Sequence, residues 1–432
     1  MSAGSNLNVT PFKGWIRSGS LFSGWISVLL LLGVALQVLP PAPIFLYASV
    51  LAAVLSVLLG AFPMYGNRLE SIHHHGVWFS AWSARGWSAW LLGLFLTAFY
   101  VLLYWWPEYL GMHPQGNLGL VALFDPFSVF LKGQPASQWF VYGCLYTLVI
   151  LIFGFKFILK HRRNRYQVLR TVSIMFFQTA FAFLIPEWLM RLNLPYNDFK
   201  NMWPLNYSFF DSWNLDSLIS GGSIGWFMLV FGILMIVLIS PVLTYLYGKR
   251  WYCSWVCGCG GLAETAGDSF RHLADRSLKA WKMERIVVYS ILLLTILMTA
   301  GVLYTRFSGQ GQIMGWSTEV LRKWYGFYIG GIFSGVIGVG FYPLLGSRVW
   351  CRFGCPMAAI LGIQQRLFSR FRITVNGGQC ISCGHCSASC EMGIDVRAYA
   401  QRGQDIVRAS CVGCGICSAV CPRGVLKLEN GS

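Results

Sequence analysis

The stretch CISCGHCSASC (380–390) determines how the C-terminal part of this chain folds, and CVGCGICSAVC (411–421) repeats its spacing. Both stretches read C-x2-C-x2-C-x3-C, and Pro422 follows the second one. In this motif three thiolates hold one cubane, and the last cysteine of each run ligates the other cluster. The spacing therefore predicts two [4Fe–4S] clusters, one held by Cys380, Cys383, Cys386 and Cys421 and the other by Cys411, Cys414, Cys417 and Cys390.

Zinc is the main alternative, because four thiolates also suit a structural zinc ion. Zinc sites usually pair two C-x2-C knuckles across a longer spacer, whereas here four cysteines crowd into each short stretch. Disulfides are disfavoured, because a cytoplasmic position keeps thiols reduced. Iron–sulfur clusters are therefore the favoured interpretation.

The rest of the chain has the composition of a membrane protein. Of its 432 residues, 56% are hydrophobic and 11% charged, against roughly 45–50% and 25% in soluble domains. Apolar runs of about 20 residues can cross a bilayer, and eight occur, at about 21–39, 43–61, 87–106, 139–159, 168–190, 224–247, 285–305 and 324–345. We predict an α-helical integral membrane protein with about eight transmembrane helices and a small C-terminal α+β two-cluster ferredoxin-like domain. The prolines between the first two runs predict a helical hairpin.

The positive charges predict the orientation. Before the end of the last apolar run, most Lys and Arg residues fall in the segments that lie on the N-terminal side of the membrane. Short cytoplasmic loops carry such an excess, so both termini are predicted to be cytoplasmic. The same bias accounts for the formal net charge of +17, and no nucleic-acid partner is expected.

We expect three regions along the chain. Residues 1–167 form an N-terminal four-helix membrane module, and residues 168–372 form a membrane core with interfacial helices. Residues 373–432 form the cytoplasmic 2[4Fe–4S] domain. The first two regions are therefore expected to be surrounded by membrane lipid.

The membrane core contains an internal repeat. GKRWYCSWVC (248–257) aligns with GSRVWCRFGC (346–355), and each copy follows an apolar run with the same predicted direction. This pseudo-symmetry predicts that the two C-x3-C pairs meet at the membrane surface and hold a third metal or iron–sulfur centre, through Cys253, Cys257, Cys351 and Cys355. The pairs could instead cycle as dithiols, bind copper or pack as small hydrophobes.

Other residues near the repeat have predicted roles too. Arg250 and Arg348, at matching positions, are expected to lower thiol pKa values or to offset cluster charge. Cys259 is expected to be a packing residue. Glu187, near the outer end of its apolar run, is a candidate catalytic residue for proton or quinone chemistry, or an interfacial residue that reaches water. The loop 201–218 is rich in aromatic residues and is expected to form an aromatic belt or to dock a periplasmic partner.

On these motifs, residues 168–432 resemble the polyferredoxin-type membrane proteins that include NapH, NosR and CcoG. Their pattern is C-x3-C-P, which Pro356 keeps in the second copy and Gly258 breaks in the first. The resemblance implies a multi-pass protein of the bacterial inner membrane with a membrane or periplasmic redox protein as partner and a quinone as a candidate substrate.

Three functions are compatible with these features. The first is a membrane electron-transfer protein, a redox component similar to a quinol dehydrogenase, which relays electrons between the clusters and a quinone pool or cytochrome. The second is an assembly factor that reduces copper or thiols for a respiratory complex, as the resemblance to CcoG implies. The third is a structural subunit whose clusters connect two partners of a larger assembly.

Overall fold

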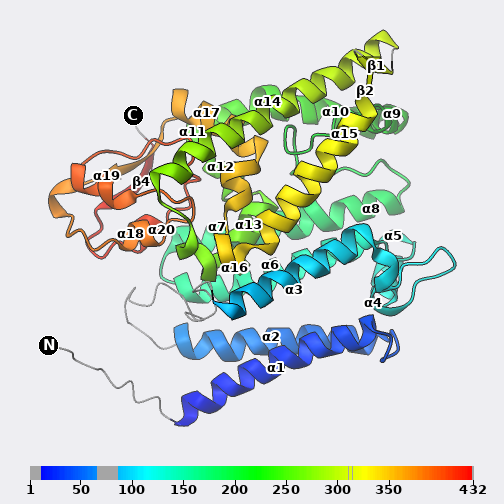
Figure 1. Ribbon diagram of the computed structural model, residues 1–432, viewed down its shortest axis with the longest axis horizontal. Coiled ribbons are helices and arrows are strands. Elements are labelled where there is room, and N and C mark those ends of the chain that lie inside the picture. Colours follow the sequence, from blue (N-terminus) through cyan, green and yellow to red (C-terminus); the bar gives the residue numbers. More distant parts are fainter. Residues whose placement is uncertain (1–10, 66–85, 310, 314, 431–432) are drawn as a thin grey trace. The chain divides into compact units, whose positions relative to one another are not determined.

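A computed structural model describes residues 11–65, 86–309, 311–313 and 315–430, and their fold is mainly helical (Figure 1). The described residues form two compact units. The first takes its residues from 1–71 and 102–162, and the second from 72–101 and 163–432. This division differs from the predicted one, because the first part of α3 (Trp87–Trp105) groups with the second unit.

The first unit contains the predicted helical hairpin. Its two long helices are α1 (Pro11–Ala35) and α2 (Pro43–Tyr65), and serines join them. The Oγ of Ser20 donates to the carbonyl oxygen of Ser56 at 2.8 Å, and the hydroxyls of Ser27 and Ser49 lie 3.0 Å apart. Such bonds between helices satisfy polar groups that lipid cannot. The other elements of this unit are η2 (Pro107–Leu110), α4 (Gly119–Ala122), α5 (Asp125–Lys132) and α6 (Gln138–His161).

Within the described residues, six helical stretches are long and apolar enough to cross a membrane. They are 18–35, 43–61, 138–161, 165–191, 222–247 and 278–308, and each overlaps a predicted span. The predicted span 87–106 corresponds to the shorter apolar helix α3. The predicted span 324–345 corresponds to α15 (Thr318–Tyr325), the π-helical η6 (Gly326–Gly340) and α16 (Tyr342–Leu345). The count of eight therefore stays a prediction.

The second unit holds the remaining helices, several of which contain π-helical segments. Its longest helix, α14 (Leu278–Ser308), begins at Ser277, whose Oγ accepts from the amide of Ala280 at 3.1 Å. The others are α7 (Arg165–Phe176), η3 (Phe177–Leu184), α8 (Ile185–Arg191), α9 (Ser212–Ser220), α10 (Gly222–Leu234), η4 (Met235–Ile239), α11 (Ser240–Tyr247), α12 (Arg250–Cys253), α13 (Gly258–Thr265), η5 (Ala266–Leu273), η7 (Trp350–Gly354) and α17 (Pro356–Phe368). A short hairpin of β1 (Gln312–Ile313) and β2 (Trp316–Ser317) follows α14.

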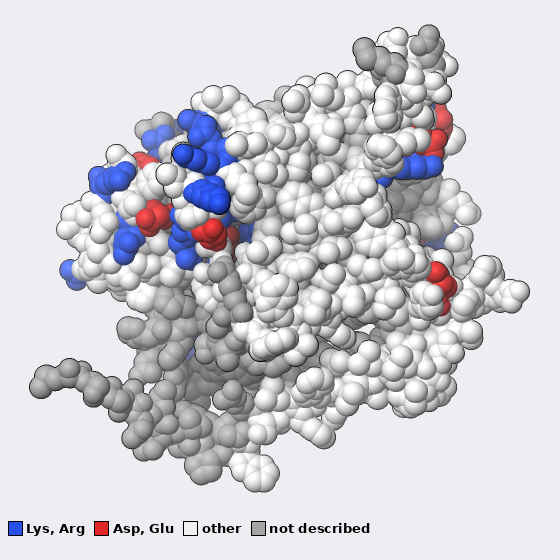
Figure 2. Space-filling model, viewed as in Figure 1, with Lys and Arg blue, Asp and Glu red and all other residues white. Residues whose placement is uncertain are grey.

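The C-terminal segment lies at one end of the second unit (Figure 1). Its two strands, β3 (Phe371–Val375) and β4 (Leu426–Asn430), pair antiparallel with Phe371 opposite Asn430. Four short helices lie between them: η8 (Gly377–Gln379), α18 (His385–Ala388), α19 (Val396–Arg402) and α20 (Ile416–Ala419). Figure 2 shows Lys and Arg side chains gathered over this end, whereas the surface of the helices beside it is largely uncharged.

This segment is bonded to the helical part of its unit. The Tyr166 hydroxyl donates to the carbonyl of Gly413 at 2.9 Å, and the Gln167 amide donates to that of Cys414 at 2.9 Å. Arg276 donates to the carbonyls of Ser387 and Ala388 at 2.6 and 2.7 Å. The segment is therefore docked on the helices and shares a continuous core with them.

The loop between α8 and α9 was predicted to form a surface aromatic belt or to dock a partner, but its first part is buried. Met202, 4% exposed, belongs to the same core cluster as Cys253 and Cys257. The indole of Trp203 donates to the hydroxyl of Thr299 on α14 at 3.0 Å. Apolar side chains and internal hydrogen bonds let a non-helical segment enter a bundle in this way. This part of the loop is therefore not a free surface belt.

Candidate iron–sulfur centres

The eight C-terminal cysteines gather around two cavities. One is lined by Cys380, Cys383, Cys386 and Cys421. The other is lined by Cys390, Cys411, Cys414 and Cys417. We name these sets ferredoxin tetrads I and II. They are the two sets expected from the spacing, with the last cysteine of each run exchanged, so the chain folds as the motif requires.

Left-handed backbone turns shape both loops. Ser382 and Gly384 flank Cys383 with φ of 56° and 78°, and Gly413 and Gly415 flank Cys414 with φ of 64° and 74°. Successive backbone amides in such turns form a concavity that favours negative charge. Since the two loops share this conformation, each can wrap an anionic cluster in the same way.

The spacing of the thiols bears on the choice between zinc and a cluster. A tetrahedral zinc ion with Zn–S bonds of about 2.3 Å would hold its sulfurs about 4 Å apart. Within the described ranges, the three ligand atoms found within 4.8 Å of one another belong to Glu264, Glu391 and Cys414. No three thiols there converge as one zinc ion needs, so the tetrads fit a larger group such as a cubane.

Burial controls the protonation of these thiols. Removal from water raises the pKa of Cys386, of Cys390 and of Cys414 to about 11. Thiolates are the form that binds metal, so loading either tetrad must displace protons.

The two C-x3-C pairs are built alike. Gly248 and Gly346 end the preceding helices with φ of 66° and 93°. The second cysteine of each pair is then the N-cap of the next helix, Cys257 for α13 and Cys355 for α17. In the second copy the amide of Ala358 donates to the sulfur of Cys355 at 3.4 Å. In the first copy Cys257 makes no such capping bond, although the nearby amide of Gly260 helps to lower its pKa. Helix N-termini favour thiolates.

The structure brings the four thiols of these pairs together. We name Cys253, Cys257, Cys351 and Cys355 the membrane tetrad. The pKa of Cys355 is raised first by burial and then by the charges of the other three thiols. Burial likewise raises the pKa of Cys253 to about 12. These four thiols from two copies interact with one another, but no three of them lie within 4.8 Å of one another, so the donor set suits an iron–sulfur centre better than a single metal ion.

Cys259 was expected to be a packing residue, yet it lies against the membrane tetrad. Its thiol donates a hydrogen bond to Cys257, which is the largest cause of the lowered pKa of Cys257. It also interacts with Cys351 and Cys355. The C-x-C spacing of Cys257 and Cys259 was a signal that could have indicated this role.

A buried ion network joins the membrane tetrad to ferredoxin tetrad II. Arg348, 1% exposed, donates to the Sγ of Cys351 at 3.7 Å and to the carbonyl of Cys253 at 3.2 Å. Its Nη2 lies 2.6 Å from Glu264 and 3.0 Å from Glu391. Both carboxylates lie within 4.8 Å of the Sγ of Cys414 in tetrad II.

Two further arginines complete this network. Arg170 pairs with Glu264, and Arg271 pairs with Glu391 at 3.2 Å. Burial alone would raise the pKa of Glu391, but Arg271 and Arg348 outweigh it and hold that pKa below its usual value. With Asp268, which also pairs with Arg271, the cluster is an ion-pair network and not a separate metal site.

Arg250 and Arg348 were predicted to act on the thiols in the same way, but only Arg348 contacts the membrane tetrad. Arg250 stacks on the ring of Phe371 with 4.3 Å to the centroid and donates to Asn430 at 3.2 Å. Its charge acts on Cys411 of tetrad II. In the first copy it is Lys249, not Arg250, whose charge acts on Cys253.

Glu187 lies close enough to a group of polar residues in the loop after α8 to act on one of them electrostatically. It is buried on α8, and its charge, after burial and Asp198, raises the pKa of Tyr196. Asn201 donates to Asp198 at 2.6 Å, and the hydroxyl of Tyr252, beside Cys253, donates to Asn201 at 3.5 Å. No sequence pattern marks Asp198 or Asn201, because their burial depends on the inward path of the loop.

Comparisons with known proteins agree with this geometry. A family model described as a 4Fe-4S dicluster domain matches residues 379–426, which contain both ferredoxin tetrads. A model described as a 4Fe-4S binding domain matches twice, at residues 229–277 and 328–374, and so covers both C-x3-C copies. The electron transport protein YccM of Escherichia coli (strain K12) is 27% identical over 165 residues.

The match to YccM covers 36% of this chain and 45% of the relative, so the chain spans less than half of the length of that protein. No solved structure is similar to the chain by this comparison. Together with six apolar helices in the part of the chain that the structure describes, the matches indicate a membrane-associated protein with 4Fe–4S cluster-binding domains.

Proposed function

We propose that this protein is a membrane-bound electron carrier that relays electrons between clusters at its C-terminal segment and a membrane partner. The observation that carries this proposal is one core cluster that includes cysteines of all three tetrads, among them Cys253, Cys386 and Cys411. Iron–sulfur clusters supply one-electron redox chemistry, and the protein supplies their position and surroundings. The name of YccM supports the same role.

The membrane tetrad is proposed to be a third centre. Two matches of the 4Fe-4S binding model to its flanking segments support this, together with the convergence of its four thiols. Arg348 would hold the centre against tetrad II, because one guanidinium contacts both Cys351 and Glu391. The proposed location is a bacterial inner membrane with cytoplasmic termini, which the resemblance to NapH-type proteins supports.

A quinone is the proposed membrane partner, with Glu187 as the group that handles its protons. The charges of Glu187 and Asp198 both act on Tyr196, and hydrogen bonds join Asp198 through Asn201 to Tyr252, which supports this assignment. A buried acid within a membrane helix often marks such a site.

The experiment is reduction of the anaerobically purified protein in liposomes, followed by EPR. Addition of a reduced menaquinone analogue should produce cluster signals, and a Glu187→Gln variant should slow their appearance at least about tenfold while dithionite still reduces all clusters. If quinol produces no signal in the wild type, the quinone assignment is wrong. Proteins that copurify in stoichiometric amounts would then indicate a structural subunit whose clusters carry electrons between two partners of a larger assembly.

A second function is favoured by the contact of Cys257 with Cys259. A hydrogen-bonded thiol pair beside three further thiols suits copper binding or dithiol chemistry, as an assembly factor would need. Copper bound by the purified wild type, and lost in a Cys257→Ser variant, would support this role.

A further inference from the structure

A basic cavity lies beside the first turns of α14. Its volume is about 260 Å³, and it lies between α14, α17 and the segment before tetrad II. The described lining residues that carry charge are five cations and one acid: Lys249, Arg285, Arg352, Arg366, Arg408 and Glu284. None of these charged residues belongs to a cysteine tetrad, although Cys351 of the membrane tetrad also lines the cavity.

The charges inside the cavity do not balance. Glu284 is committed to Arg352, with 2.7 Å between its Oε2 and the Nε of the arginine. Lys249 is 1% exposed and donates to the carbonyls of Ala358 and Ala409, which carry no full charge. The lining therefore has an excess of positive charge that an anion would offset.

Two of the arginines are held at the mouth of the cavity by one indole. The guanidinium of Arg285 lies 5.1 Å from the ring centroid of Trp281, and that of Arg408 lies 5.2 Å from it. Cation–π contacts of this kind orient both groups. Arg366, exposed on α17, adds a third.

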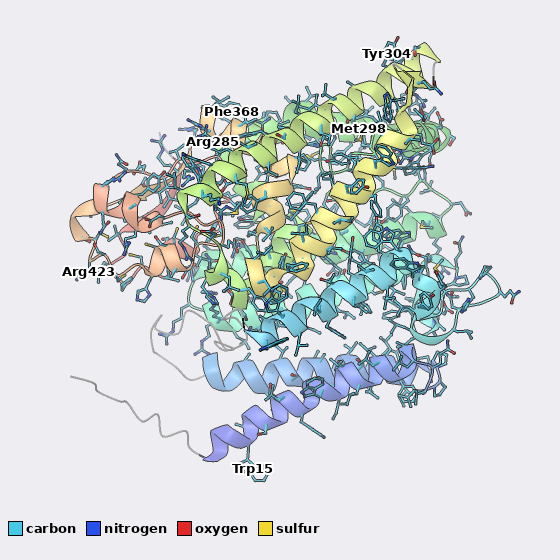
Figure 3. The ribbon with its side chains drawn as sticks, viewed as in Figure 1. Trp15, Arg285, Met298, Tyr304, Phe368 and Arg423 are labelled. Carbon is cyan, nitrogen blue, oxygen red and sulfur yellow. The ribbon has the colours of Figure 1, made fainter. Side chains whose placement is uncertain are left out.

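The position of the cavity along α14 indicates whether its ligand is a lipid. A helix of 31 residues is about 46 Å long, whereas the hydrocarbon core is about 30 Å thick. The first turns of α14, which carry Trp281 and Arg285, can therefore extend to the level of the lipid headgroups. Figure 3 shows Arg285 and Phe368 at the same end of α14 and α17.

The two helices that line the cavity also carry exposed apolar side chains. Ile286 on α14 is 69% exposed, and Leu367 on α17 is 74% exposed. Ile363 and Phe368 on α17 are exposed as well. A ligand with a phosphate for the arginines and hydrocarbon chains for these residues satisfies both features.

We propose that this cavity binds the phosphate headgroup of an anionic phospholipid, with its acyl chains along α14 and α17. Basic pockets at the cytoplasmic ends of membrane helices recognise such headgroups. A soluble phosphate would use only the arginines and would leave the apolar side chains without a role.

The test is native mass spectrometry of the full-length, delipidated protein with phosphatidylglycerol. Phosphatidylcholine is the zwitterionic control, and inorganic phosphate is the soluble competitor. The variant Arg285→Gln/Arg366→Gln/Arg408→Gln should weaken phosphatidylglycerol binding about fivefold for each arginine, roughly a hundredfold in all. Its iron content should equal that of the wild type, which shows that it folds.

A matched control removes the same charge at another helix end. The variant Arg162→Gln/Arg163→Gln/Arg165→Gln changes three exposed arginines between the end of α6 and the start of α7 and should bind phosphatidylglycerol as the wild type does. Equal weakening by both triple variants would overturn the proposal, since general surface charge would then explain binding. Equal binding of phosphatidylcholine, or displacement of the lipid by inorganic phosphate at similar concentration, would overturn it as well.

Discussion

The two C-x3-C copies, residues 248–257 and 346–355, have similar sequences but different surroundings. Both begin at a glycine with positive φ, and both place their second cysteine at a helix N-cap. The second copy sends Arg348 inward to the membrane tetrad and its ion network. The first copy sends Arg250 outward to β3 and β4.

The difference shows how one motif can serve two tasks. The backbone of both copies presents cysteines to the shared site, because local conformation depends on the motif itself. The flanking side chains follow what packs against each copy, which is the C-terminal segment for the first and α13 with its Glu264 for the second. Internal symmetry in the sequence therefore predicts the thiols better than it predicts the charges around them.

The largest expected effect comes from removing one thiol of each copy. A Cys253→Ser/Cys351→Ser variant should lower the iron content from about twelve to about eight atoms per chain, because two ferredoxin clusters remain. Iron and acid-labile sulfide on anaerobically purified protein measure this. Cys144→Ser, within α6, is the control and should keep all the iron. About eight irons in the wild type would show that the copies hold no third cubane.

The arginines of the two copies should differ in their effect on stability. Arg348→Gln leaves Glu264 and Glu391 with less compensation in a buried site, which costs about 3–5 kcal/mol. Arg250→Gln removes a half-buried contact and should cost about 1 kcal/mol or less. Denaturation of the purified variants gives both values. Equal losses would contradict the asymmetry between the copies.

Gln365 distinguishes the first copy, because it ties that copy to the C-terminal segment. It accepts from the amide of Lys249 at 2.8 Å and donates to the carbonyls of Arg408 and Cys411 at 2.8 and 2.9 Å. Gln365→Leu should destabilise the protein by about 2–4 kcal/mol, since buried polar groups lose their partners. Hydrogen exchange should rise around Cys411, whereas the neighbouring Gln364→Leu should leave it unchanged.

The additional thiol of the first copy should affect reactivity more than stability. In a Cys259→Ala variant, the pKa of Cys257 should rise, because its main stabilising hydrogen bond is lost. At a pH between the two pKa values less Cys257 is then thiolate, so alkylation of the iron-free protein should slow several-fold. Alkylation rates across pH, followed by mass spectrometry, test this. If the alkylation rate shows the same pH dependence in the variant and the wild type, Cys259 is a packing residue only.

The smallest effect is expected where the first copy departs from C-x3-C-P. Gly258 is the first residue of α13, a position that suits proline. Gly258→Pro should therefore change stability by less than about 1 kcal/mol and leave the iron content unchanged. A loss of iron would show that the two copies need different residues at this place.

Parts of the fold could be predicted because their cause is local. Each of the six long apolar helices overlaps a predicted span, since length and hydropathy alone satisfy a bilayer. The ferredoxin cysteines likewise follow from short loops with fixed turns. The inward path of Met202 and the partners of Arg348 could not be predicted, because both depend on residues far away in the chain.

Local spacing was enough to predict how the eight C-terminal cysteines are grouped, from Cys380 and Cys411 onward, and hydropathy was enough to predict the apolar helices. The contact of Cys259 with the membrane tetrad, and the link that Arg348 and Glu391 make between this tetrad and tetrad II, depend on tertiary packing. The reason is the distance along the chain over which each effect acts. Spacing and hydropathy act over a few residues, whereas burial and ion pairing depend on which distant segments meet in the core.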